Sequence, residues 1–186
     1  MTEDLELARN FKLINRLEID PGAWIAPGAV VVGSVIVGEG SSIWFGCVVR
    51  GDIAPVTIGK HTNVQDGCIL HVGARHPCTL GDRVSLGHGA IVHGATVEDD
   101  CLIAMRATVL NGAVIGRGSV VGAGAVVPEG MIVPPGSLVL GVPAKVIKPV
   151  DDRLRTGIAA TAEGYAGYAR GYKAFEDDGQ VYPFQS

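Results

Sequence analysis

The chain has 186 residues, an apolar share of 47% and a charged share of 18%, which suits one well-buried domain and argues against disorder. Its net charge is −4 and it has no cluster of lysine and arginine, so neither a nucleic acid nor a membrane surface is an expected partner. Aromatic residues make up 5% of the chain, against 27 glycines. This balance favours a thin, repetitive β architecture with a core of small and β-branched side chains.

Residues 1–20 form a lead-in before any repeat begins. Their start, MTEDLELARN, is acidic and has no apolar segment, which is unlike a secretory signal or an arginine-rich transit peptide. The four cysteines are irregularly spaced without a CxxC pair, which suits a reducing compartment. No apolar run approaches membrane-spanning length, so we expect a cytoplasmic protein.

An aliphatic residue then recurs about every six residues, and a small residue follows most of them by four positions. The aliphatic positions are Ile25, Val31, Val37, Ile43, Val49, Ile58, Val64, Leu70, Leu80, Leu86, Val92, Val97, Ile103, Val109, Ile115, Val121, Val127, Val133 and Val139. This is the hexapeptide pattern of a parallel β-helix, in which three short strands form one triangular coil around the aliphatic side chains. The pattern predicts an all-β solenoid domain over residues 1–150.

Beyond Val150 the pattern changes. Leu154, Ile158, Tyr165 and Tyr168, followed by Tyr172, approximate a helical stripe. Four glycines within the same stretch each weaken a helix by roughly 1 kcal/mol relative to alanine. We therefore predict that residues 151–186 form a C-terminal helix and tail that are held by packing on the coils.

The repeat also predicts which side chains are neighbours. Because three hexads make one coil, every third unit lies on the same face, about 4.8 Å further along the axis. The residues that follow the aliphatic position in three such units are Arg50, His71 and His93, which should form one outward column. His71 and His93 are then close enough to share a zinc ion at about 2.0 to 2.1 Å per nitrogen.

His88 belongs to a different column. It follows Leu86 by two positions on the preceding face, in a column with Asp66, and should point around the corner of the coil. His88 and His93 of one chain are therefore not expected to bind the same ion. If the ends of the two faces meet across a threefold axis, His71 and His93 of one chain would meet His88 of the next.

The motifs VVRGD, IGKHTNVQDGCILH, LGHGAIVHG and LGVPAKV resemble those of gamma-class carbonic anhydrases over nearly all of residues 11–150. The resemblance implies a left-handed coil and a homotrimer with three interfacial metal ions, each bound by His71, His93 and a neighbouring His88. The further roles that it implies are interface ion pairs for Arg50, Asp52 and Asp66, a hydrogen bond from Gln65 to the metal-bound hydroxide, and support of that network by Asn63.

A three-histidine site with an open position is catalytic in type, because the metal lowers the pKa of bound water to about 7. The hydroxide formed there is the only nucleophile that hydration of CO₂ to bicarbonate requires. The ligand set suits zinc, ferrous iron and cobalt alike. The sequence thus predicts a metal-dependent carbonic anhydrase.

Two departures from the family pattern keep other functions open. Archetypal members carry a glutamate directly after the VVRGD motif and another in an acidic loop after the first histidine. Here those places hold Ile53 and the non-acidic loop VGARHPC, so proton export lacks its usual carriers. The alternatives are an acyl-CoA thioesterase or acyltransferase of the hexapeptide type, and a non-enzymatic trimeric assembly protein that retains the metal site.

Overall fold

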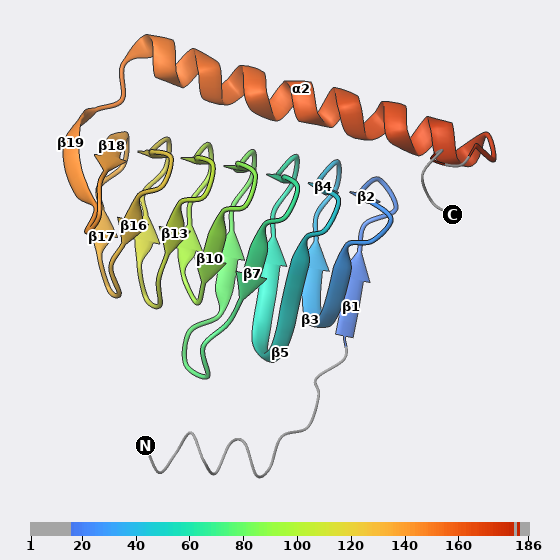
Figure 1. Cartoon of the computed structure of the whole chain (residues 1–186), viewed down its shortest axis with the longest axis horizontal. Coiled ribbons are helices and arrows are strands. Elements are labelled where there is room, and N and C mark those ends of the chain that lie inside the picture. The colour runs from blue at the N-terminus through green and yellow to red at the C-terminus, as the bar shows by residue number, and fades with distance from the viewer. Residues whose placement is uncertain (1–15, 181, 183–186) are drawn as a thin grey trace.

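The structure, a computed structural model, describes residues 16–180 and 182. It is a parallel β-solenoid of about seven turns with one C-terminal helix, of the left-handed hexapeptide type, as the repeat and the resemblance predict. Figure 1 shows the coils stacked along the long axis of the molecule, with helix α2 (Asp152–Asp177) lying along one side of the stack.

The strands form three faces. Face 1 contains β2 (Trp24–Ile25), β4 (Ser42–Ile43), β6 (Asn63–Val64), β9 (Ser85–Leu86), β12 (Leu102–Ile103), β15 (Val120–Val121), β18 (Ser137–Leu140) and, antiparallel at its end, β19 (Lys145–Pro149). Face 2 contains β7 (Ile69–His71), β10 (Ile91–His93), β13 (Thr108–Val109) and β16 (Val126–Val127). Face 3 contains β1 (Arg16–Ile19), β8 (Cys78–Leu80), β11 (Thr96–Val97), β14 (Val114–Ile115) and β17 (Ile132–Val133). Two long strands, β3 (Val30–Val37) and β5 (Val48–Ile58), turn the corner between faces 2 and 3 and pair on both.

The aliphatic positions of the repeat fill the interior. Ile43, Val64, Leu86 and Ile103 stack in register along face 1 and are completely buried. The small residues complete the core, because the triangular coil leaves no room for larger side chains near its corners. All four cysteines, which are free and buried, lie within this core.

The corner between faces 1 and 2 needs a residue with positive φ in each coil. Glycine holds this place at Gly46, Gly67, Gly89 and Gly124, with φ between 67° and 69°. Arg106 takes the equivalent place with φ 57°, although a side chain in this backbone region costs energy. The sequence AMRA therefore puts local strain into one corner of the solenoid.

The structure extends the solenoid into the predicted lead-in, because β1 (Arg16–Ile19) pairs in parallel with β3. The motif MTEDLELARN lies outside the described residues. All four side chains of β1 are exposed, so this strand lacks the buried aliphatic residue by which the other coils are identified in the sequence.

Helix α2 covers face 1. Asp151 caps its N-terminus by accepting a hydrogen bond from the backbone N–H of Leu154 at 3.0 Å, and the helix then contacts β2, β4, β6 and β9. Its buried residues are Ile158, Ala162 and Ala169. Packing on the coils thus holds a glycine-rich helix. Across the described part of the chain, none of the helical stretches combines the length and hydrophobicity needed to cross a lipid bilayer.

Candidate metal centre

His71 and His93 are neighbours on face 2. They occupy matching places in β7 and β10, as the six-residue repeat predicts, and His71 Nδ1 lies 3.0 Å from His93 Nε2. The outer nitrogen of each ring has its own partner. His71 Nε2 lies 3.1 Å from Asp52 Oδ1, and His93 Nδ1 lies 2.8 Å from Asn111 Oδ1.

These outer partners determine where the ring protons lie. The side-chain N–H of Asn111 donates to Glu129 Oε1 at 3.4 Å, so Asn111 presents its oxygen to His93 and accepts a hydrogen bond from Nδ1–H. A carboxylate can only accept, so His71 Nε2–H donates to Asp52. The two nitrogens that face each other therefore both carry lone pairs.

Two lone pairs 3.0 Å apart repel each other unless a cation lies between them. Two nitrogens bound tetrahedrally at about 2.0 to 2.1 Å from one zinc ion stand about 3.3 Å apart, close to the observed 3.0 Å. Histidine ligands that donate their second N–H to a carboxylate or another oxygen acceptor are the usual arrangement around bound metals. The donor atoms of His71 and His93 therefore fit a metal ion.

The surroundings favour neutral imidazole at His71. Burial lowers the pKa of His71 more than the hydrogen bond to Asp52 raises it. Burial raises the pKa of Asp52, but hydrogen bonds from Arg50 and His71 outweigh this and bring the pKa below its ordinary value. Asp52 is thus an anion that pairs with Arg50 and orients a neutral ring, which is the form of histidine that binds metals.

His88 repeats the same arrangement at another place. It lies in the turn between β9 and β10, with Nδ1 at 2.9 Å from Asp66 Oδ2. Nδ1–H donates to this carboxylate, so Nε2 carries the lone pair and accepts a hydrogen bond from the Tyr165 hydroxyl at 3.3 Å. His88 thus also has one nitrogen held by an acceptor and the other suited to a metal.

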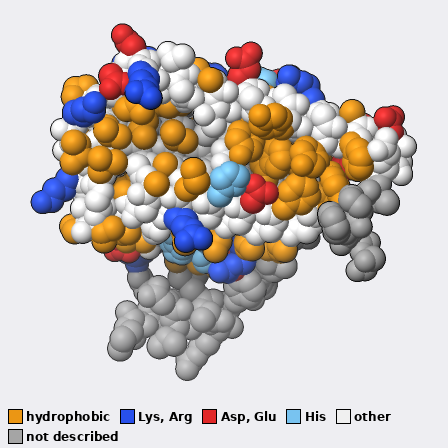
Figure 2. Space-filling view, turned by 45° about the horizontal axis from the view of Figure 1, so that its top comes forward, with side chains coloured by type: hydrophobic (Ala, Val, Ile, Leu, Met, Phe, Trp, Pro, Cys, Tyr) orange, Lys and Arg blue, Asp and Glu red, His pale blue; other side chains and the backbone are white. Residues whose placement is uncertain are grey.

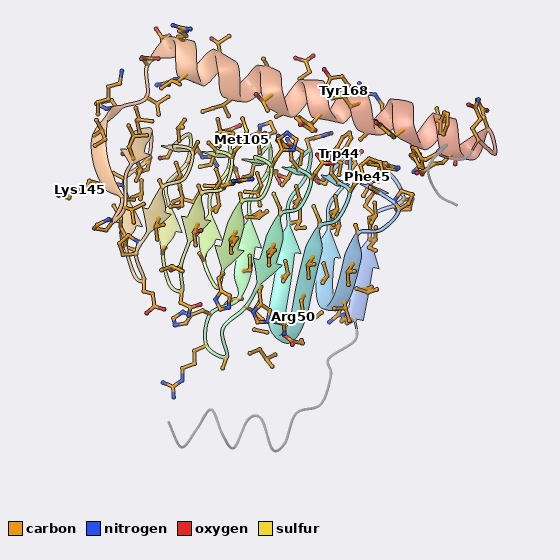
Figure 3. The ribbon with its side chains drawn as sticks, in the orientation of Figure 1. Trp44, Phe45, Arg50, Met105, Lys145 and Tyr168 are labelled. Atoms are coloured by element: carbon orange, nitrogen blue, oxygen red, sulfur yellow. The ribbon has the colours of Figure 1, made fainter. Side chains whose placement is uncertain are left out.

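His88 is separated from the histidine pair within the chain. Met105 is the neighbour of His88 on the next coil, and Arg50 is the neighbour of His71 on the preceding coil. In Figure 3 the labels of Met105 and Arg50 lie at opposite edges of the coils. The described residues of one chain contain no cluster of three metal-binding side chains. Within the described residues, His88 and the His71–His93 pair are therefore two separate groups.

The other predicted site residues are also buried or paired. Gln65 Nε2 donates to Asn63 Oδ1 at 3.0 Å, and Asn63 Nδ2 donates to Ser85 Oγ at 2.8 Å. This row lies on face 1, next to Asp66. Arg50 pairs with Asp52 within the chain, so the interchain ion pairs expected for Arg50, Asp52 and Asp66 stay a prediction, as do the roles of Gln65 and Asn63.

Sequence reasoning missed two partners of the histidines, Asn111 and Tyr165. Asn111 lies on the coil next to His93 and follows the aliphatic position Val109 by two residues. This place in the repeat is the one sequence signal that could have identified Asn111.

Tyr165 was predicted only as part of a packing stripe. It belongs to an aromatic group beside Asp66 that surrounds a cavity of about 360 Å³. The other members of this group are Trp44, Phe45, Tyr168 and Tyr172. Figure 3 labels Trp44 and Phe45 between the coils and α2, and Tyr168 on the helix.

The fold and the repeat define a hexapeptide-repeat protein. The family model of the bacterial transferase hexapeptide (six repeats) matches residues 17–51 and 94–129. A probable carbonic anhydrase of Methanocaldococcus jannaschii is 46% identical over 141 residues, which are 76% of this chain and 89% of that protein. The chain belongs to the gamma carbonic anhydrase family.

Two further relatives set the limits of this assignment. Gamma carbonic anhydrase 1 of Arabidopsis thaliana, a mitochondrial protein, is 39% identical over 91% of this chain, but the match spans only 65% of the plant protein. A crystal structure from Bacillus cereus described as a putative acetyltransferase is 40% identical with a TM-score of 0.85, and the match covers 87% of this chain and 94% of that one. Relatives of this similarity thus carry names for two different reactions.

Proposed function

We propose that the protein is a metal-dependent carbonic anhydrase that hydrates CO₂ reversibly to bicarbonate. Its site would combine His71 and His93 of one chain with His88 of the next chain in a homotrimer. The observation that carries this proposal is the orientation of the three rings: in each, an acceptor of the same chain holds one nitrogen and leaves a lone pair on the other.

Each part of the site has a defined task in this reaction. His71, His93 and a neighbouring His88 would hold a divalent metal, which would supply a nucleophile for CO₂ near neutral pH. Asp52, Asn111 and Asp66 fix the tautomers and orient the three rings. Gln65, which is 5% exposed and held by Asn63, offers an amide beside Asp66 that would orient the nucleophile by a hydrogen bond.

A partly exposed apolar column on face 2 supports the trimer. The register joins Val30, Val48, Ile69 and Ile91 in one row across four coils, and Val30 and Ile69 are 52% and 40% exposed. Figure 2 shows hydrophobic side chains gathered into patches on the surface beside α2 as well. Apolar patches of this kind are commonly covered by another protein. Ile69 and Ile91 of this column lie on the same strands as His71 and His93, so a second copy seated on the column would reach the histidine pair.

The proposal extends to the metal, the compartment and the domains. Zinc is the first candidate, with ferrous iron and cobalt also compatible with three nitrogen ligands. Four free, buried cysteines are compatible with the cytoplasm. We also propose that residues 1–150 form the β-helix domain, and that residues 151–186 are a helix and tail packed on it.

Two specific observations support other functions. The Bacillus cereus relative is described as a putative acetyltransferase, which favours a thioesterase or acyltransferase acting on acyl-CoA. The place expected for a shuttle glutamate holds Ile53, which is 37% exposed and cannot carry a proton. A non-enzymatic assembly protein would not need that carrier.

The test is a CO₂ hydration assay on protein purified without oxygen and loaded with zinc, cobalt or ferrous iron. We expect hydration with at least one metal and its loss in His88→Ala, whereas His61→Ala, which changes an exposed histidine outside the proposed site, should keep it. Absence of hydration with every metal would contradict the proposal. Hydrolysis of acyl-CoA by the same inactive sample would favour the thioesterase.

A further inference from the structure

A second cavity, of about 870 Å³, lies on the other side of α2 from the aromatic group. Its walls come from the corner between faces 3 and 1 and from one side of α2 between Arg155 and Arg170. This volume lies in the range of pockets that bind small molecules. No residue assigned to the metal centre lines the cavity.

The helix itself divides the two cavities. One side of α2 carries Arg155, Ala159, Ala166 and Arg170, because successive spacings of four, seven and four residues return to the same side of a helix. They all line the larger cavity. The tyrosines project from the opposite side towards Asp66. Small alanine side chains next to the arginines leave the space that forms the cavity.

Four arginines line this cavity, against two carboxylates, in a chain whose net charge is −4. Arg83 is bound by Asp100 through two hydrogen bonds of 2.6 and 3.0 Å, and Arg117 donates to Asp99 at 2.6 Å. Asp100 and Asp99 thus pair with the two corner arginines, and the positive charge left at the cavity comes from Arg155 and Arg170, against the one carboxylate of Glu163.

The two arginines from the helix differ from the two at the corner. Within residues 16–180 and 182, neither Arg155 nor Arg170 forms an ion pair with a carboxylate. Among the described residues, the side chain of Arg155 donates only to the backbone oxygen of Val150, at 3.4 Å. A guanidinium presents a planar set of donors that fits phosphate and carboxylate groups, and here two of them border an apolar surface.

We propose that this cavity binds a small organic oxyanion, in which a phosphate or carboxylate group is carried on an apolar body. Arg155 and Arg170 would bind the anionic group. Ala159, which is exposed, and Ala166, which is half-buried, lie on the same side of the helix and would contact the apolar body. The proposal concerns a site separate from the metal centre, so it holds or fails independently of the carbonic anhydrase activity.

Phenyl phosphate and benzoate are suitable probes, because they carry the two anions on the same ring. We expect at least one of them to bind the full-length protein in isothermal titration calorimetry, and their comparison distinguishes phosphate from carboxylate. Arg155→Ala and Arg170→Ala should each weaken this binding by about tenfold or more, since each removes a charge-assisted hydrogen bond. The same titration on His88→Ala excludes anion binding at the metal centre.

Arg153→Ala is the matched control, because Arg153 carries the same charge on the same helix and does not line the cavity. It should bind the probe like the wild type. Circular dichroism would verify that each variant is folded. Failure of both probes to bind at about 10 mM, equivalent to less than roughly 3 kcal/mol of binding free energy, would overturn the proposal. Equal affinity of folded Arg155→Ala, Arg170→Ala and Arg153→Ala would overturn it as well.

Discussion

The hydrogen bond from His93 to Asn111 gives a sharp test of how the metal centre is built. In Asn111→Leu the side chain keeps a similar size but loses the oxygen that accepts from His93 Nδ1–H at 2.8 Å. The His93 ring would then no longer be held in one tautomer. In part of the molecules the proton would move to Nε2, the nitrogen that faces His71 and would bind the metal.

The expected loss follows from this geometry. Removal of an outer partner from a ligating histidine typically weakens metal binding by about 10- to 100-fold, which corresponds to about 1.4 to 2.7 kcal/mol. Asn111→Asp keeps an acceptor and adds a negative charge, so it should bind the metal at least as tightly as the wild type. Glu129→Gln changes only the long 3.4 Å contact behind Asn111 and should alter the affinity by less than about threefold.

The assay is competition between the protein and a chromophoric chelator for zinc or cobalt, with the oligomeric state checked for each variant. A folded Asn111→Leu protein with wild-type metal affinity would refute the role of this hydrogen bond. An Asn111→Asp protein as weak as Asn111→Leu would show that the acceptor is not what matters.

Four further predictions follow from the same structure. Leu70 is completely buried, whereas Ile132 is 65% exposed. In urea unfolding, Leu70→Ala should therefore lower the free energy of unfolding by about 2 to 5 kcal/mol, and Ile132→Ala by less than about 0.5 kcal/mol. Equal losses would contradict the assigned core. Arg106→Gly should stabilise the protein by about 1 kcal/mol, because it relieves a side chain at φ 57°, and a lower melting temperature would argue against strain at this corner. Tyr165→Phe should strengthen metal binding by about 2- to 10-fold, because the Tyr165 hydroxyl occupies the lone pair of His88 Nε2. Weaker metal binding in this variant would show that the hydroxyl supports the metal instead. Burial raises the pKa of Cys78 and of Cys101 to about 12. A thiol reagent at pH 8 should therefore label these two cysteines only after the protein unfolds. Rapid labelling of the native protein would contradict their burial.

The sequence predicted the parts of the site that depend on the period of the repeat. A coil of three hexads places His71 beside His93 whatever the side chains around them do, and the register of β7 and β10 confirms this. The same period separates His88 from the pair. Such predictions succeed because parallel strands in a solenoid have one register, repeated from coil to coil.

The parts that the sequence did not predict depend on side-chain direction and tertiary packing. Asn111 holds His93 only because its amide turns towards the neighbouring coil, which the repeat does not determine. Tyr165 reaches His88 only because α2 packs on face 1 in one particular rotation. Strand β1 lies at the end of the solenoid with all its side chains exposed, so it lacks the buried aliphatic residue on which the repeat pattern depends.

The central claim is that the metal site is shared between chains, and mixing two inactive variants tests it directly. Neither His88→Ala nor His93→Ala alone should bind metal at the site. In a trimer that contains both variants, one site combines the intact His71 and His93 of one chain with the intact His88 of its neighbour. A 1:1 mixture after subunit exchange should therefore regain about one quarter of the wild-type metal content. No recovery despite confirmed exchange of subunits would contradict the shared site.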